Sequence, residues 1–191
     1  MTGTAFIETD ENDRQMVRAL ARGLEVLRCF KPGDRFLGNQ EIAVRTGLPK
    51  PTISRLTHTL TTLGYLNYSE KFGKYYLGTA VLALGYSLLA NMDIRKIARP
   101  FMQELAEYAQ ASVTLGVQDR LNMIYIEAYR SSSTVTLTLD VGSQLPIATT
   151  SMGRALLCAL PEREREDIME QIRVRNEALW PRIKAGIDQR R

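Results

Sequence analysis

Two short helical segments joined by a glycine-containing turn constrain the fold of this chain more than any other feature. Apolar periodicity predicts one helix over residues 39–45 and a second over residues 51–63. Between them, Thr46-Gly47-Leu48-Pro49 forms a tight connection in which Gly47 suits the C-terminal turn of the first helix. Pro51 is tolerated in the first turn of the second helix. Together these features are the helix-turn-helix pattern.

A predicted helix before this pair and a predicted hairpin after it complete a larger motif. Residues 16–30 place apolar side chains on one helical face, at Val17, Leu20, Leu24, Leu27 and Phe30. Tyrosine-rich segments at 65–68 and 75–77 predict two strands, and the loop between them carries lysines. Three helices followed by a hairpin with a basic tip make a winged helix, which we expect over residues 14–78.

The remainder of the chain predicts a linker helix and a second domain. Residues 79–90 are apolar around much of the helical circumference, and the pattern continues after Asp93 as a stripe in which Pro100 marks a kink or a new helix start. The sequence then predicts strands at 113–117, 123–129 and 135–141, and helices at 151–160 and 162–175. Helices beside a mainly antiparallel sheet indicate an α+β domain.

Charge is distributed unevenly along the chain. Residues 14–77 hold 11 basic and 4 acidic side chains, a net charge of +7, whereas residues 78–191 hold 14 and 13, a net charge of +1. Residues 1–13 carry four acidic side chains and no basic one, which predicts an acidic flexible tail. A basic module joined to a nearly neutral one indicates a polyanion partner for the first module only.

The second short helix has the composition of a DNA-binding surface. Between Lys50 and Thr62 it contains no acid, two cations, one histidine and six hydroxyl residues. Arginine recognises guanine, and serine or threonine accepts several bases. We expect four of its side chains to read bases, namely Thr52, Ser54, Arg55 and His58. Lys50 would position the DNA backbone, and Pro51 lies on the same face. The alternative is a polar helix face with no further role.

Three other residues are candidate DNA contacts. Lys71 and Lys74 flank Gly73 at the hairpin tip, which can straddle a phosphate backbone or enter the minor groove. The alternative is a solvated loop whose lysines deter edge pairing. Asn39 would hydrogen-bond a phosphate from the first short helix, or serve only as its N-cap.

Other functional classes are disfavoured. The chain has one histidine, His58, and two cysteines, Cys29 and Cys158, which lie far apart in sequence, so we expect neither a metal site nor a disulfide framework. No GxSxG, HExxH or phosphate-binding loop occurs, so we expect no enzyme and no cofactor. No signal peptide and no membrane helix are recognised, which predicts a cytoplasmic protein.

In their order and spacing, six stretches resemble the IclR (isocitrate lyase regulator) type of bacterial transcription factor. They are Arg18-Ala-Leu-Ala-Arg-Gly-Leu-Glu-Val-Leu-Arg28, Glu41-Ile-Ala-Val-Arg-Thr-Gly-Leu-Pro-Lys50, Leu63-Gly-Tyr65, Tyr76-Leu-Gly78, Ile97-Ala-Arg-Pro100 and Thr150-Ser-Met-Gly-Arg-Ala-Leu-Leu157. The resemblance implies a winged helix, a dimerising linker helix at 79–92, and a GAF-like effector domain at 93–191. It also implies a homodimer or dimer of dimers on a palindromic operator in double-stranded DNA. Pro51 and Asn39 depart from the residue types common in the family.

The start of the helix at 151–160 is the candidate effector site. Free backbone N–H groups and the helix dipole at that end would attract a ligand carboxylate. The resemblance implies that this loop lines a pocket for small organic acids or aromatic metabolites. The expected residues are Thr150, Ser151, Met152 and Gly153. The alternative is a plain N-capping Ser151. Gly153 would permit close approach of ligand or backbone.

Chains of the family extend several tens of residues beyond the point where this sequence ends. The resemblance therefore implies that the C-terminal part of the effector domain is missing. Two functions remain open. One is a DNA-binding regulator whose affinity is modulated by a small organic acid or aromatic metabolite. The other is a constitutive DNA-binding and oligomerisation protein whose second domain binds no ligand.

Overall fold

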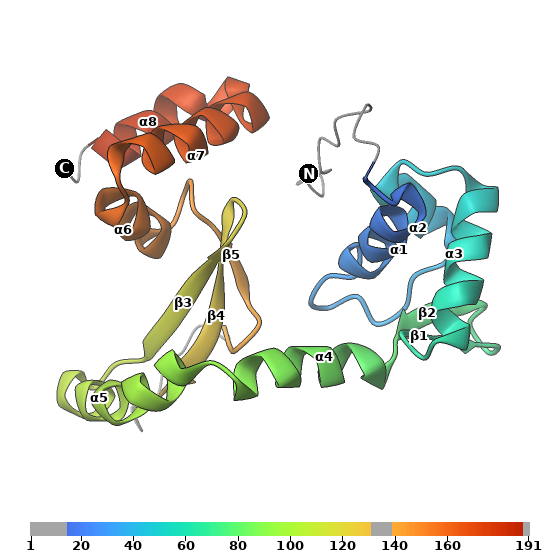
Figure 1. Ribbon diagram of the computed structural model, residues 1–191, viewed down its shortest axis with the longest axis horizontal. Coiled ribbons are helices and arrows are strands. Elements are labelled where there is room, and N and C mark those ends of the chain that lie inside the picture. Colours follow the sequence, from blue (N-terminus) through green and yellow to red (C-terminus); the bar gives the residue numbers. More distant parts are fainter. Residues whose placement is uncertain (1–14, 131–138, 189–191) are drawn as a thin grey trace. The chain divides into compact units, whose positions relative to one another are not determined.

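The computed structural model describes residues 15–130 and 139–188, which belong to two compact units, 1–88 and 89–191 (Figure 1). The predicted acidic tail at 1–13 lies outside the described residues. So does most of the predicted strand at 135–141. Of that segment, Leu139 and Asp140 belong to no strand, and Val141 lies in a turn.

The first unit contains the predicted helix-turn-helix and hairpin. Its elements are α1 (Arg18–Arg28), α2 (Asn39–Thr46), α3 (Lys50–Thr62), β1 (Leu66–Ser69), β2 (Lys74–Leu77) and most of α4 (Thr79–Ala90). The two strands are antiparallel, with Leu66 opposite Leu77 and Ser69 opposite Lys74. Leu37 adds a bridge to Tyr75 through backbone hydrogen bonds of 2.9 and 2.8 Å. The prediction of a helix-turn-helix followed by a hairpin is therefore confirmed.

Two glycines determine how these elements connect. Gly47 ends α2 with φ of 69°, and its N–H donates to the carbonyl of Ala43 at 2.8 Å. This is the left-handed C-terminal turn that the sequence predicts. Gly78, which precedes α4, lies against the end of α3, and a Cβ there would stand 2.1 Å from the carbonyl oxygen of Gly64. Only glycine permits that approach.

Only the C-terminal end of the apolar face predicted over residues 16–30 meets the core of the first unit, where Leu27 and Phe30 pack against it while partly buried. The buried residues are Val26, Cys29, Leu37, Ile42, Ile53, Leu60 and Leu66. Val17, Leu20 and Leu24 are all more than half exposed. The buried residues of α1 are Gly23 and Val26, and a Cβ on Gly23 would lie 3.9 Å from Cδ2 of Leu56 on α3. The predicted apolar face is therefore exposed over its N-terminal part and meets the core only at its C-terminal end.

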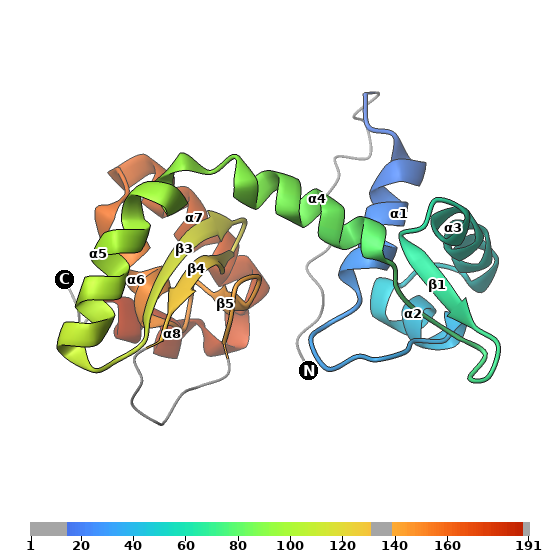
Figure 2. The same cartoon turned by 90° about the horizontal axis from the view of Figure 1, so that it is seen from below.

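The second unit packs helices on a small antiparallel sheet (Figure 2). Its elements are α5 (Asp93–Ala109), β3 (Val113–Asp119), β4 (Asn122–Tyr129), β5 (Gln144–Pro146), α6 (Ser151–Ala159), α7 (Glu162–Arg175), a 3-10 turn (Glu177–Leu179) and α8 (Trp180–Asp188). The strand order is β3-β4-β5. The α+β prediction is confirmed. Neither β5 nor α8 was predicted, and α5 begins at Asp93, so Pro100 is not a helix start.

Burial in the second unit is one-sided. Its core consists of Met123, Ile147, Ala148, Leu157, Ile168, Ile172, Ile183 and Ile187. Helix α5 packs against β3 and β4 but buries only Met102 and Ala106. Five large side chains on α5 stay at least half exposed: Ile94, Ile97, Phe101, Leu105 and Tyr108. Within the described ranges, no helix is both long and apolar enough to span a membrane.

Candidate nucleic-acid interface

Helix α3 turns its predicted interface residues away from the core. Lys50, Pro51, Ser54, Arg55 and His58 are exposed, and Thr52 is half-buried. The opposite side buries Ile53, Thr57 and Leu60. Because α3 carries no acid, its exposed face presents guanidinium, imidazole, ammonium and hydroxyl groups with no internal carboxylate competing for them. That combination suits phosphates and base edges.

Some hydroxyls of α3 serve the helix itself. Thr57 donates to the carbonyl of Ile53 at 2.9 Å and is fully buried. Thr59 and Thr62 donate to the carbonyls of Arg55 and His58, each at 3.0 Å. The high hydroxyl content of α3 therefore overstates the number of groups available to a ligand.

Asn39 bridges the two helices of the helix-turn-helix. Its Nδ2 donates to Oγ of Ser54 at 3.4 Å, and its Oδ1 lies 3.4 Å from Oγ1 of Thr57, whose shorter hydrogen bond goes to Ile53. Asn39 is not the N-cap of α2. Gly38 holds that position, and its N–H donates to Oε2 of Glu41 at 2.7 Å. The N-cap alternative for Asn39 is wrong, and its phosphate contact stays a prediction.

The two lysines of the hairpin differ in their surroundings. Nζ of Lys74 lies 2.9 Å from Oε2 of Glu41, so Lys74 is already paired. Lys74, together with the N–H of Gly38, lowers the pKa of Glu41 below its usual value. Nζ of Lys71 lies 5.5 Å from the centre of the Phe72 ring, and both side chains are exposed. Lys71 is therefore the more available cation.

An aromatic cluster beside the hairpin was not predicted. The rings of Phe36 and Phe72 lie 4.8 Å apart, Phe36 and Tyr76 lie 5.6 Å apart, and the Arg35 guanidinium stands 5.5 Å above Phe36. Arg35 thus adds an exposed cation to this surface. The sequence signal was the Arg-Phe pair immediately before the buried Leu37.

Behind the interface, an ion pair fixes the loop between α1 and α2. Nη2 of Arg45 donates to Oδ1 of Asp34 at 3.0 Å, and Nη1 donates to the carbonyl of Cys29 at 2.9 Å. Arg45, followed by the N–H of Lys31, holds the pKa of Asp34 below its usual range. Burial raises the pKa of the Cys29 thiol to about 11, so this cysteine stays a neutral core residue.

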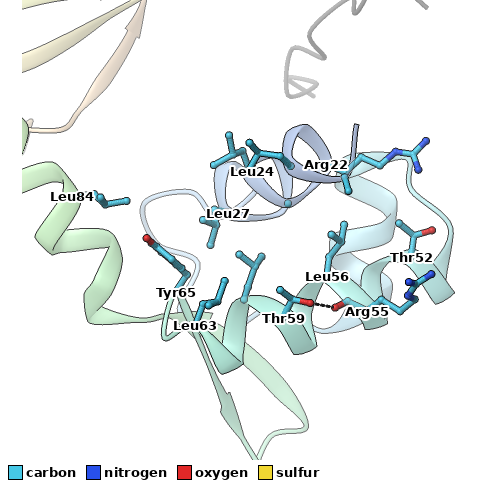
Figure 3. Close-up of a pocket in the computed structure, with 14 residues that line it drawn as sticks. Arg22, Leu24, Leu27, Thr52, Arg55, Leu56, Thr59, Leu63, Tyr65 and Leu84 are labelled. Atoms are coloured by element: carbon cyan, nitrogen blue, oxygen red, sulfur yellow. Dashed lines mark hydrogen bonds between the residues drawn. The ribbon is translucent and has the colours of Figure 1, made fainter. Parts of the chain in front are cut away.

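A groove opens between α1 and α3, next to the start of α4 (Figure 3). Its volume is about 620 Å³. Arg22, Thr52 and Arg55 lie at one end. Leucines line the rest: Leu20, Leu24, Leu27, Leu56, Leu60, Leu63 and Leu84. The exposed apolar face of α1 therefore forms one wall of a hollow in the surface of the winged helix.

The candidate effector loop is largely occupied by its own packing. Thr150, not Ser151, caps α6: its Oγ1 accepts from the N–H of Gly153 at 3.2 Å and donates to the carbonyl of Pro146 at 2.8 Å. Gly153 lies against Ile147, the residue that follows β5, and a Cβ there would stand 2.3 Å from Cα of Ile147. The close approach at Gly153 is thus to backbone. Ser151 is exposed.

Both parts of the chain match models of one protein family. Residues 19–70 match the IclR helix-turn-helix domain, and residues 86–178 match the bacterial transcriptional regulator IclR C-terminal domain. The HTH-type transcriptional regulator TsaQ1/TsaQ2 of Comamonas testosteroni is 37% identical over 183 residues, which are 95% of this chain and 66% of that protein.

Two solved structures are also similar. An IclR family transcriptional regulator from Brucella abortus is 52% identical with a TM-score of 0.87, over 96% of this chain and 69% of the other. An IclR homolog from Microbacterium hydrocarbonoxydans, complexed with 4-hydroxybenzoate, is 25% identical with a TM-score of 0.64, over 80% and 63%. The chain spans 53% to 66% of the length of three curated relatives. With both parts matched, the chain belongs to the IclR family of bacterial transcription regulators.

Proposed function

We propose that this chain binds double-stranded DNA sequence-specifically and regulates transcription. The observation that carries the proposal is the exposed, acid-free face of α3 in a helix-turn-helix whose surroundings are basic. Arg55, Ser54, Thr52 and His58 read base edges, while Lys50 and Lys71 position the backbone. Lys74 contacts phosphate only after releasing Glu41. Asn39 and Pro51 shape the start of this surface.

The proposed unit of action is a homodimer, alone or as a dimer of dimers, on a palindromic operator. None of the residues of α4, all of which the structure describes, is buried, and no charge occurs between Tyr75 and Met92. An uncharged helix with apolar side chains around its circumference needs a partner surface in water. Pairing through α4 would set the spacing between half-sites.

We propose domain boundaries at 14–78, 79–92 and 93–191, and a location in the cytoplasm.

For the second unit we propose that a small organic acid or aromatic effector binds at the start of α6. The complex of an IclR homolog with 4-hydroxybenzoate supports this ligand class. A carboxylate there would be held by helix N–H groups near Ser151. Regulation requires that the ligand bind two states of the protein with different affinity.

The packing of the α6 loop favours a second candidate function, constitutive DNA binding without a ligand. Thr150 caps α6, Gly153 contacts the backbone of Ile147, and Met152 packs against the core. A thermal-shift screen of aromatic and aliphatic carboxylates, including 4-hydroxybenzoate, separates the two. A hit that also changes DNA affinity supports regulation, and hits that leave DNA affinity unchanged support the constitutive function.

Arg55→Ala tests the DNA-binding proposal directly. On a duplex selected by the wild-type protein, the variant should lose about 1–3 kcal/mol of binding free energy and tolerate any base at one position. Arg163→Ala, an exposed arginine of α7, is the matched control and should bind normally. Fluorescence anisotropy measures both. Equal losses on selected and random DNA would remove Arg55 from the base-reading residues.

A further inference from the structure

A buried carboxylate joins α5 to the sheet of the second unit. Glu127 on β4 is 7% exposed, and its Oε2 lies 3.0 Å from Nη2 of Arg95 and accepts from Nε of Arg99 at 2.9 Å. Arg95 is 14% exposed, whereas Arg99 is half exposed. Glu127 is therefore held by one buried and one partly solvated guanidinium. Burying charges in this way is costly and often stabilises less than an apolar pair of similar volume.

The buried arginine also contacts the end of α4. Nη1 of Arg95 donates to the carbonyl of Leu89 at 2.9 Å. This carbonyl is one of the last four of α4, which have no partner within the helix, and it also accepts from the N–H of Met92 at 3.4 Å, so the guanidinium adds a second and shorter hydrogen bond. One side chain thus ties the last turn of α4, which continues along the chain into the winged helix, to strand β4.

On its other side, Glu127 adjoins the candidate effector loop through β3. Glu127 pairs with Leu115, directly before the irregularity between Leu115 and Gly116. Gly116 supports the side chain of Met152, the second residue of α6, so closely that a Cβ on Gly116 would stand 2.4 Å from Sδ of Met152. A displacement of Met152 would therefore act on Gly116 of β3, the neighbour of Leu115, which pairs with Glu127.

We propose that Arg95 and Glu127 are positioning residues that couple the start of α6 to the last turn of α4. The path runs from Met152 to Gly116, across β3 to Glu127, and through Arg95 to Leu89. This inference rests on the proposed function, because its consequence is the regulation of the DNA-binding surface. A ligand or substitution that moves Met152 changes how firmly β4 holds the end of α4. A thermodynamic cycle measures this coupling.

The cycle combines a change at each end of the path. Met152→Ala removes the thioether from Gly116 and stands in for a displaced effector loop. Glu127→Gln keeps the shape of the side chain but removes its charge. Amide hydrogen exchange of Leu88, Leu89 and Ala90 reports on the end of α4. Glu127→Gln alone should accelerate this exchange about tenfold, the factor expected for losing a hydrogen-bonded charge. Met152→Ala should change exchange at these amides in the wild-type background and leave it unchanged in the Glu127→Gln background.

Two further variants keep the outcome interpretable. Arg99→Gln loses a contact to Glu127 but none to α4, so exchange at the end of α4 should stay within about twofold of wild type. Arg95→Lys keeps the charge, loses the forked pair of donors and should behave like Glu127→Gln; it replaces that variant if Glu127→Gln does not fold. The same effect of Met152→Ala in both backgrounds would overturn the proposal.

Operator affinity, measured on the same variants, separates this inference from the proposed function. Met152→Ala should alter DNA affinity in the wild-type background only. If the wild-type protein bound no duplex, the proposed function would fail, while the exchange cycle would still decide whether the path exists. If DNA were bound but the effects were additive, the proposed function would stand and the coupling would be rejected.

Discussion

The exposed face of α3 and the start of α6 carry similar side chains but use them differently. On α3, Ser54 and Arg55 project into solvent and take no part in the core. At α6, Thr150 caps the helix and Gly153 makes room for the backbone of Ile147. A surface that meets rigid duplex DNA can keep its contacts separate from its packing, whereas a ligand loop within a small domain shares residues with the fold. Substitutions should therefore affect binding at α3 and stability at α6.

Gly153→Ala should give the largest effect. Its Cβ would collide with the backbone of Ile147, and relieving that contact requires α6 and β5 to separate. We expect a loss of about 3–5 kcal/mol in the free energy of unfolding of the second unit. Gly186→Ala in α8 is the control, because its Cβ would meet only Nη1 of Arg154 at 3.7 Å. Urea unfolding compares the two, and equal stabilities would show that the close approach costs nothing.

Asp34→Asn should lower the free energy of unfolding of the first unit by about 1–2 kcal/mol. The substitution removes the charge-assisted pair with Arg45, which is only partly buried. The pKa of Asp34 is depressed in the folded state, so this stabilisation is present above the unfolded pKa of about 3.9 and is lost as pH falls through the folded value. Thermal unfolding of the two proteins should converge as the pH falls below the depressed pKa that Asp34 has in the folded state. Glu70→Gln, an exposed change, should show no such convergence.

Thr150→Ala and Ser151→Ala separate capping from exposure at α6. Loss of the Thr150 cap should cost about 1 kcal/mol of unfolding free energy. Ser151→Ala should stay within about 0.5 kcal/mol, as expected at an exposed position. Thermal denaturation measures both variants. A larger loss of unfolding free energy for Ser151→Ala than for Thr150→Ala would show that Ser151 is the N-cap, as the sequence suggested.

The two hairpin lysines should give the smallest effects, and these should be on DNA affinity alone. The slope of log affinity against log salt concentration is negative, and Lys71→Ala should reduce its magnitude by about 0.9, the value for one phosphate contact. Lys74→Ala should change it less, because Lys74 is paired with Glu41. Glu41→Gln releases Lys74 and should raise affinity for any duplex about threefold, the equivalent of a weak surface ion pair. Salt titrations that rank the lysines in the opposite order would contradict this.

Sequence patterns predicted the elements well and the contacts between side chains poorly. Periodicity and turn residues located the helix-turn-helix, the hairpin and α4, because each is long or ends at a glycine or proline with a defined role. The three residues of β5 carry too little alternation to be recognised. On α1, most of the predicted apolar face is exposed, and the neighbouring face with Gly23 and Val26 is buried. Helical spacing cannot decide between such faces.

The candidate site shows the same division. The helical periodicity of α3, about 100° per residue, predicted the exposure of Pro51, Arg55, His58 and Thr62, with Ser54 beside them. The pairing of Lys74 with Glu41 and the bridge from Asn39 to Ser54 depend on how separate elements pack, so the sequence offered alternatives without deciding them. The structure confirms that α6 begins at Ser151, which makes Ser151 the first helical residue and Thr150 the N-cap.

Selection of duplexes from a random library by the purified chain, followed by titration at physiological salt, tests the DNA-binding proposal most directly. A palindromic sequence should be enriched and bound at least about 10³-fold more tightly than random DNA. Arg55→Ala should lower that ratio by about 5- to 150-fold, the equivalent of about 1–3 kcal/mol. Recovery of unrelated sequences, all bound with the same affinity and the same salt dependence as random DNA, would contradict sequence-specific recognition by α3.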